Sequence, residues 1–133
     1  MNLNQLTIKE AKNGLKNKKF SSVELTKACL EQIRKYNDDL NAFITITEKE
    51  ALAQAKSADY LASQGETLQT KSLLGIPIAL KDLFSTKGIK TTAGSNVLKD
   101  YNPQYDATVV KKLKNAGAVI IGKTNLDAWA HGS

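Results

Sequence analysis

The residues best suited to chemistry in this sequence are Lys81 and Asp82, which end a short apolar run that begins at Leu73. Apolar runs of strand length between turn signals predict a strand buried on both faces, and α/β enzymes place functional groups where such strands end. An apolar wall around Lys81 would favour the neutral amine, which can act as a general base or as a Schiff-base nucleophile. Strand alternation would point Asp82 to the opposite face, so the acid need not pair with the amine. The alternative is that both residues are only the polar end of a buried strand.

Other combinations of reactive residues have less support in the sequence. The one histidine, His131, cannot build a metal site, and no Cys or His pair has ligand spacing. The segment from Gly88 to Gly94 lacks the glycine order and the Gly-Lys pair of a phosphate-binding loop. A Ser-His-Asp hydrolase would need His131, Ser95 and Asp127 to meet, which the residue types permit but no pattern supports. A serine-lysine hydrolase remains, because a neutral amine can take a proton from a hydroxyl nucleophile.

Composition points to one soluble, folded domain. The chain has 133 residues, of which 41% are hydrophobic and 24% are charged, which excludes disordered and membrane classes. The single cysteine, Cys29, rules out an internal disulfide framework and is expected in the core. The first residues carry no apolar leader after a basic segment, so we expect a cytoplasmic location, with an organellar matrix as the alternative.

The basic charge of the chain raises a second, noncatalytic hypothesis. The net charge is +6, from 19 basic and 13 acidic residues, which would suit an acidic partner such as RNA. If the first helix persists, one of its faces carries Lys9, Lys12, Lys16 and Lys19. This stripe could dock a nucleic acid as a basic binding module, or it could face water.

Helix starts are marked by hydroxyl or acidic residues followed by a carboxylate three positions later. Thr7 with Glu10, Ser21 with Glu24 and Thr47 with Glu50 fit the capping box, and Asp106 fits a simple N-cap. The expected helices cover residues 8–16, 22–36, 48 to Gly65, and 107 to Gly117. The apolar positions of the second helix are Leu25, Ala28, Cys29, Ile33 and Tyr36, which we expect to be buried.

Three apolar segments predict strands, at 42–46, 73–81 and 118–121. The segment 84–105 is rich in Gly, Thr, Ser and Asn without a period, so we expect a long functional loop. Strands that alternate with helices in this way predict a parallel α/β sheet with right-handed crossovers.

Several blocks in a fixed order then resemble the N-terminal part of the amidase signature family. They are Gly75–Asp82, Thr92–Ser95, Asp106–Asn125 and Leu126–Ser133. The resemblance implies an α/β/α three-layer fold with a mixed central sheet. It also implies that residues 1–133 are the N-terminal portion of a single amidase domain, with a helical region at 1–40 and the start of the α/β core at 41–133.

The resemblance also assigns roles to residues. The family uses a serine nucleophile, a bridging serine and a lysine, and the lysine falls on Lys81, which would deprotonate the bridging serine. Gly132 and Ser133 match a Gly-Ser pair that lines the acyl pocket. The Gly-Gly-Ser-Ser-Gly-Gly-Ser run that carries the two serines does not occur in these 133 residues. We therefore expect the serines to lie downstream, and this chain alone to be inactive.

Within the family, the sequence looks most similar to glutaminase subunits that feed ammonia to tRNA-dependent amidotransferases. That likeness implies hydrolysis of glutamine to convert Glu-tRNA(Gln) to Gln-tRNA(Gln), and Asp-tRNA(Asn) to Asn-tRNA(Asn). It implies two partners, the B and C subunits of the amidotransferase complex, with ATP and Mg²⁺ used by a partner and no cofactor bound by this chain. The alternative is another carboxamide hydrolase of the same family.

Overall fold

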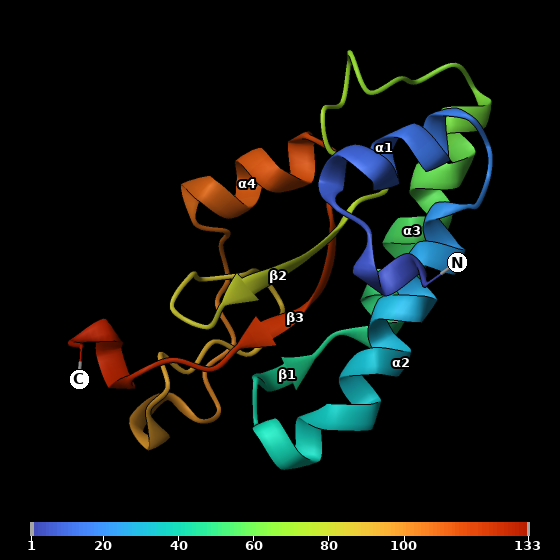
Figure 1. The fold of residues 1–133 in the computed structure, drawn as a ribbon. Coiled ribbons are helices and arrows are strands. Elements are labelled where there is room, and N and C mark those ends of the chain that lie inside the picture. Colours follow the sequence, from blue (N-terminus) through green and yellow to red (C-terminus); the bar gives the residue numbers. More distant parts are fainter. Residues whose placement is uncertain (1, 133) are drawn as a thin grey trace.

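The computed structural model describes residues 2–132, which contain a three-stranded sheet and four α-helices (Figure 1). Strands β1 (Phe43–Ile46), β2 (Pro77–Lys81) and β3 (Val119–Thr124) form the sheet in the order β1-β3-β2. The central strand, β3, pairs in parallel with β2 and antiparallel with β1. The mixed sheet implied by the family resemblance is therefore confirmed.

The wholly parallel sheet predicted from the strand and helix alternation is wrong for β1. The chain reverses just before this strand, at Asn41, whose φ of 50° is left-handed. The side-chain amide of Asn37 then fixes the strand entry, because it accepts from the Phe43 N–H and donates to the Phe43 carbonyl. β1 therefore starts directly from the end of α2 and runs antiparallel to β3, which follows it in the chain only after α3, β2 and α4.

Helices cover both faces of the sheet. Helices α2 (Ser22–Leu40) and α3 (Glu48–Ser63) lie on one side, and α4 (Thr108–Asn115) lies on the other (Figure 1). Leu30 and Ala55 pack with Val119 of β3 in the first layer, and Val110 packs with Ile120 in the second. Helix α1 (Ile8–Lys16) contributes to a third apolar cluster. The α/β/α arrangement implied by the resemblance is confirmed.

Two of the four expected helix caps form as predicted. Thr7 with Glu10, and Ser21 with Glu24, make reciprocal capping boxes at the starts of α1 and α2. The caps predicted at Thr47 and Asp106 are wrong. The Thr47 hydroxyl instead donates to the Ile120 carbonyl at 2.9 Å, and Asp106 accepts from the Lys87 N–H and from Lys114. Longer-range partners replace local capping at these two positions.

The burial predicted for the strands holds for β3 but not for β2. Residues Val119 to Lys123 are all buried, as expected for a strand with helices on both faces. Strand β2 begins at Pro77 rather than at Leu73, it lies at the edge of this sheet, and its Ala79 is exposed. Gly122 permits a close approach to β1, since an added Cβ would lie 2.6 Å from the Thr45 carbonyl oxygen.

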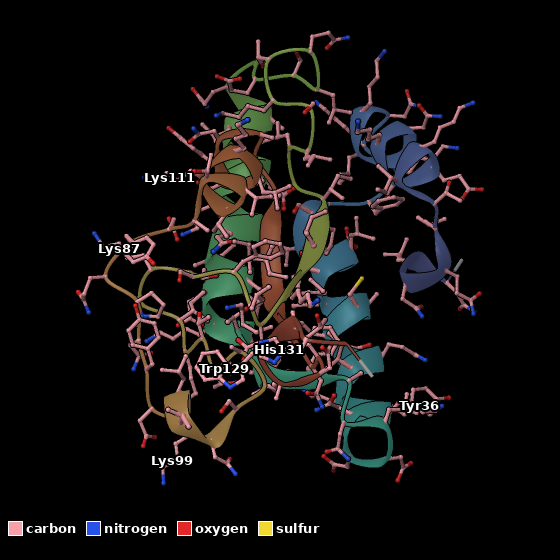
Figure 2. All side chains as sticks on the ribbon, turned by 90° about the vertical axis from the view of Figure 1, so that its left-hand side faces the viewer. Tyr36, Lys87, Lys99, Lys111, Trp129 and His131 are labelled. Carbon is pink, nitrogen blue, oxygen red and sulfur yellow. The ribbon has the colours of Figure 1, made fainter. Side chains whose placement is uncertain are left out.

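The apolar face predicted for the second helix is confirmed except at one end. Leu25 is buried and Cys29 is partly buried against the core, and this burial raises the pKa of the Cys29 thiol. Tyr36 was expected inside but points outward at the lower edge of α2 (Figure 2). Its ring lies 5.0 Å from the Lys35 ammonium group. Among residues 2–132, no helix is both long enough and apolar enough to span a membrane.

Candidate active site at the carboxyl end of the sheet

Lys81 is the last residue of β2, and it pairs with Thr124 of β3 at the carboxyl edge of the two parallel strands. The loop that follows β2 and the C-terminal segment that follows β3 both lie at this edge (Figure 1). Hydrogen bonds fix the main chain on both sides of Lys81. Its carbonyl accepts from the Phe84 N–H at 3.1 Å, and the Asp82 N–H donates to the Thr124 carbonyl at 3.0 Å. The backbone that carries the candidate base is therefore rigidly held.

Asp82 and Lys123 form a buried ion pair immediately beside Lys81. Both side chains are 0% exposed, and Lys123 Nζ lies 3.2 Å from Asp82 Oδ1. The Oδ1 contact is an ion pair without hydrogen-bond alignment, whereas Nζ donates aligned hydrogen bonds to the Phe84 carbonyl at 2.9 Å and to Thr91 Oγ1 at 2.7 Å. Burial lowers the pKa of Lys123, and the Asp82 carboxylate opposes that shift. The pair joins β3, the end of β2 and the following loop.

The deeply buried lysine is thus Lys123, whereas Lys81 is only partly buried. The apolar wall expected around Lys81 forms in part, since Leu80 is buried but Ala79 is exposed. As strand alternation predicts, Asp82 does not pair with Lys81. Lys123 follows the strand expected at 118–121, and the sequence predicted no role for it. Its position offered a signal, however. Lys123 comes two residues after Ile121, at the end of a strand expected to be buried on both faces, and a charged residue there needs a buried partner.

The loop after β2 connects this ion pair to the C-terminal segment. Asp82 Oδ2 accepts from both the N–H and the hydroxyl of Thr92, and the Asp82 carbonyl accepts from the Ala93 N–H at 3.0 Å. The Ala93 carbonyl in turn accepts from the Trp129 N–H at 2.8 Å. Gly94 has a φ of +65°, and an added Cβ there would lie 2.8 Å from the Leu126 carbonyl oxygen. Residues 91–94 therefore hold segment 126–129 close to the end of β2.

The expected acyl-pocket residues lie at the end of the chain. Gly132 is exposed, and its N–H donates to Asp127 Oδ2, whereas Ser133 lies outside the described residues. Exposed Trp129 and His131 neighbour one another on the face that lies to the left in Figure 1 (Figure 2).

Ser95, His131 and Asp127 do not form the alternative hydrolase triad. The Ser95 hydroxyl accepts from Val97 N–H, and no described contact joins His131 to either of the other two side chains. Residues 2–132 also contain no cluster of His, Cys, Asp and Glu arranged for a metal ion.

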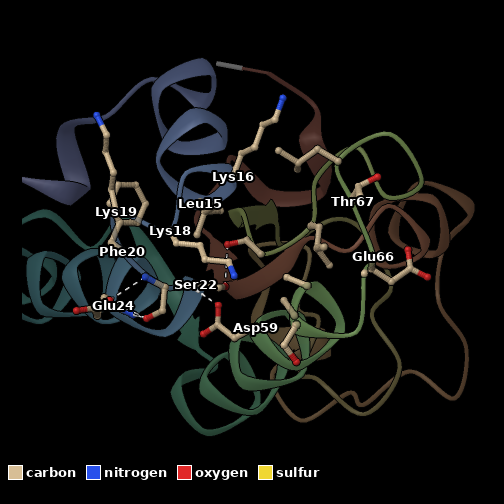
Figure 3. A pocket seen from close by; sticks show the side chains of 18 of the residues that line it. Leu15, Lys16, Lys18, Lys19, Phe20, Ser22, Glu24, Asp59, Glu66 and Thr67 are labelled. Atoms are coloured by element: carbon tan, nitrogen blue, oxygen red, sulfur yellow. Dashed lines mark hydrogen bonds between the residues drawn. The ribbon is translucent and has the colours of Figure 1, made fainter.

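The lysine stripe expected on the first helix forms only in part. Lys9 and Lys16 are exposed on α1, but Lys12 is half-buried and Lys19 follows the end of the helix. A cavity of about 630 Å³ lies beside the stripe, between α1, α2, α3 and the connector before β2. Figure 3 shows Leu15 and Phe20 on its wall and several lysines at its rim.

Comparison with protein families places this geometry in a known class. The amidase family model matches residues 24–133, which is most of the chain. This chain therefore belongs to the amidase family.

Individual members of the family are similar to this chain over almost its whole length. The A subunit of glutamyl-tRNA(Gln) amidotransferase from Coxiella burnetii is 53% identical over 131 residues, and its counterpart from Pseudomonas entomophila is 51% identical. Each match covers 98% of this chain and 26% of the relative. The chain thus spans about a quarter of the length of these curated relatives.

Solved structures of the family share the fold. The peptide amidase of Stenotrophomonas maltophilia matches with a TM-score of 0.88 at 32% identity, over 96% of this chain and 26% of that one. A bacterial aryl acylamidase of the amidase signature family matches with a TM-score of 0.83 at 26% identity, over 93% of this chain and 26% of that one.

Proposed function

We propose that this chain is the lysine-bearing N-terminal part of the glutaminase (A) subunit of a tRNA-dependent amidotransferase. The observation that carries the proposal is the position of Lys81. It ends a strand of an amidase fold, at the edge where two loops converge, in a chain 53% identical to the A subunit of a glutamyl-tRNA(Gln) amidotransferase. Active sites of α/β proteins lie at the carboxyl ends of strands, so the fold gives an independent reason for this assignment.

In the proposed reaction, Lys81 acts as a general base. Its amine takes a proton from the bridging serine, which relays the proton from the nucleophilic serine as the latter attacks the side-chain amide of glutamine. Both serines belong to residues that are not among these 133. Gly132 and Ser133 would line the acyl pocket. Return of the proton to the leaving nitrogen would release ammonia and leave an acyl-serine, which water would hydrolyse to glutamate and free serine.

The proposed assembly passes the ammonia to a partner protein. The B subunit would activate the mischarged tRNA with ATP and Mg²⁺, and the C subunit would complete a cytoplasmic complex. Glu-tRNA(Gln), Asp-tRNA(Asn) or both would be amidated. This chain would bind neither the nucleotide nor the metal ion.

A second candidate is a carboxamide hydrolase that acts without tRNA. The structural similarity to a peptide amidase and to an aryl acylamidase supports this alternative. Identity favours the first proposal, because it is 53% to the amidotransferase relative and 32% and 26% to those two enzymes.

The two candidates differ in substrate preference. Full-length protein co-purified with its B and C partners should hydrolyse glutamine, measured by ammonia release, with a kcat/KM at least about tenfold above that for a peptide amide, measured in the same way, or an aryl acylamide, measured by arylamine release, because only glutamine would fill its acyl pocket. A preference for either of the other amides would contradict the glutaminase proposal and support the alternative. Omitting the enzyme gives the background rate.

A further inference from the structure

The buried pair Asp82–Lys123 does more than neutralise two charges. The Lys123 ammonium group has three donors and three oxygen neighbours, which come from Asp82, Phe84 and Thr91. The Lys123 and Asp82 side chains are fully enclosed, and Thr91 is 3% exposed. The Lys123 ammonium group therefore has no access to water and contacts only these protein oxygens.

Two of these contacts are made to Asp82 and Phe84, which form the turn directly after Lys81. Phe84 donates its N–H to the Lys81 carbonyl and offers its own carbonyl to Lys123 Nζ. Asp82, the next residue after Lys81, is fixed through its main chain by Thr124 and Ala93 and through its carboxylate by Thr92. The turn after Lys81 is therefore held by these main-chain hydrogen bonds and by the Lys123 ammonium group, which contacts both Asp82 and Phe84.

We infer that Asp82 and Lys123 are positioning residues for Lys81, which set the turn after β2 so that the lysine amine meets its hydroxyl partner. The inference rests on the proposed function of Lys81 and adds two residues to its machinery. Neither residue need touch substrate. Both act through the main chain of residues 81–84 and the loop 91–94.

A double variant separates positioning from a purely structural role. Breaking a buried ion pair by removing one partner destabilises a protein strongly because it leaves an uncompensated buried charge, and that penalty disappears when neither partner is charged. Asp82→Asn and Lys123→Met should each lower the melting temperature of the full-length protein, and the combined variant should recover most of that loss. The combined variant still lacks the bonds from Nζ to Phe84 and Thr91.

Two measurements on the combined variant then test the inference. Hydrogen exchange of the amides in residues 82–94 should be at least about tenfold faster than in wild type, and kcat for ammonia release should fall at least about tenfold while KM changes less than about threefold. Lys99→Met, at an exposed position, is the matched control and should change neither.

Opposite results would overturn the inference. If the amides of residues 82–94 exchange in the combined variant at the wild-type rate, or if its kcat stays within about twofold of wild type, the pair is only structural. If the wild-type protein hydrolyses no carboxamide, the proposed function fails. The exchange measurement still decides whether Lys123 holds the turn.

Discussion

At the scale of single residues, the depth of burial decides what each lysine can do. Lys123 is enclosed, donates hydrogen bonds to the Phe84 carbonyl and to Thr91 Oγ1, and forms an ion pair with Asp82, so its ammonium group is held by internal contacts. Lys81 is partly buried one strand away and has no such set of partners among the described residues. Burial thus suits Lys123 to a structural role and leaves Lys81 free for the proposed role of general base.

Asp106 provides a pH test at this scale. Burial acts to raise its pKa, but hydrogen bonds from Lys114 and from the Lys87 N–H outweigh burial and hold the pKa below its ordinary value. A carboxyl group whose folded pKa is lowered stabilises the fold above its unfolded pKa of about 3.9, and that stabilisation is lost as pH falls through the folded value. The Lys114 ammonium side chain is 33% exposed, so solvent weakens the ion pair.

We expect Asp106→Asn to lower the free energy of unfolding by about 0.5 kcal/mol at pH 7, and this difference should shrink as pH falls from the unfolded pKa through the lowered folded pKa of Asp106. Urea unfolding of the full-length protein across this range measures the difference. The exposed Asp100→Asn is the control. A loss in Asp106→Asn that stays constant with pH would show that the ion pair is not its source.

At the scale of elements, the contact between β1 and β3 depends on the absence of a side chain at Gly122. An added Cβ would lie 2.6 Å from the Thr45 carbonyl oxygen and 2.7 Å from Phe43 Cδ1. Backbone cannot move aside as a flexible side chain can. Gly122→Ala should therefore separate the two strands and destabilise the fold by about 1–3 kcal/mol, as overpacking does elsewhere.

Thermal unfolding of the full-length protein tests the Gly122→Ala expectation. Ser57→Ala, on the exposed surface of α3, is a suitable control and should change stability by less than about 0.5 kcal/mol. An unchanged melting temperature in Gly122→Ala would mean that β1 can move away from β3 without loss of stability. The two strands would then be less closely packed than the structure indicates.

Sequence patterns predicted the elements better than their directions or partners. Hydrophobic periodicity and two capping boxes located α1 and α2 because these signals are local. The caps at Thr47 and Asp106 failed because those side chains bind residues far along the chain. The direction of β1 depends on a left-handed turn at Asn41, for which no pattern was available.

The candidate site, too, could be predicted from the sequence only in part. Lys81 could be found from the sequence because it ends an apolar run inside a family block. The link from Asp82 to Lys123 could not, since a pairing between residues so far apart in the chain depends on which strands become neighbours. The register that places Lys81 beside Thr124 is a property of the folded sheet.

At the scale of the whole molecule, the chain supplies one part of the proposed catalytic group. It covers about 26% of its amidotransferase relatives, and the proposed serines belong to other residues of the full-length protein. The 133 residues alone should therefore release no ammonia from glutamine above background.

The proposed function depends on Lys81 acting as the general base of the full-length protein. The most direct measurement is the rate of ammonia release from glutamine by the full-length protein in its complex, compared with Lys81→Ala and with the exposed control Lys99→Ala. General-base catalysis contributes about 100-fold or more, so Lys81→Ala should lose at least that much kcat while assembly and the melting temperature stay unchanged, and Lys99→Ala should match wild type. A Lys81→Ala complex that keeps its activity would show that Lys81 is not the general base.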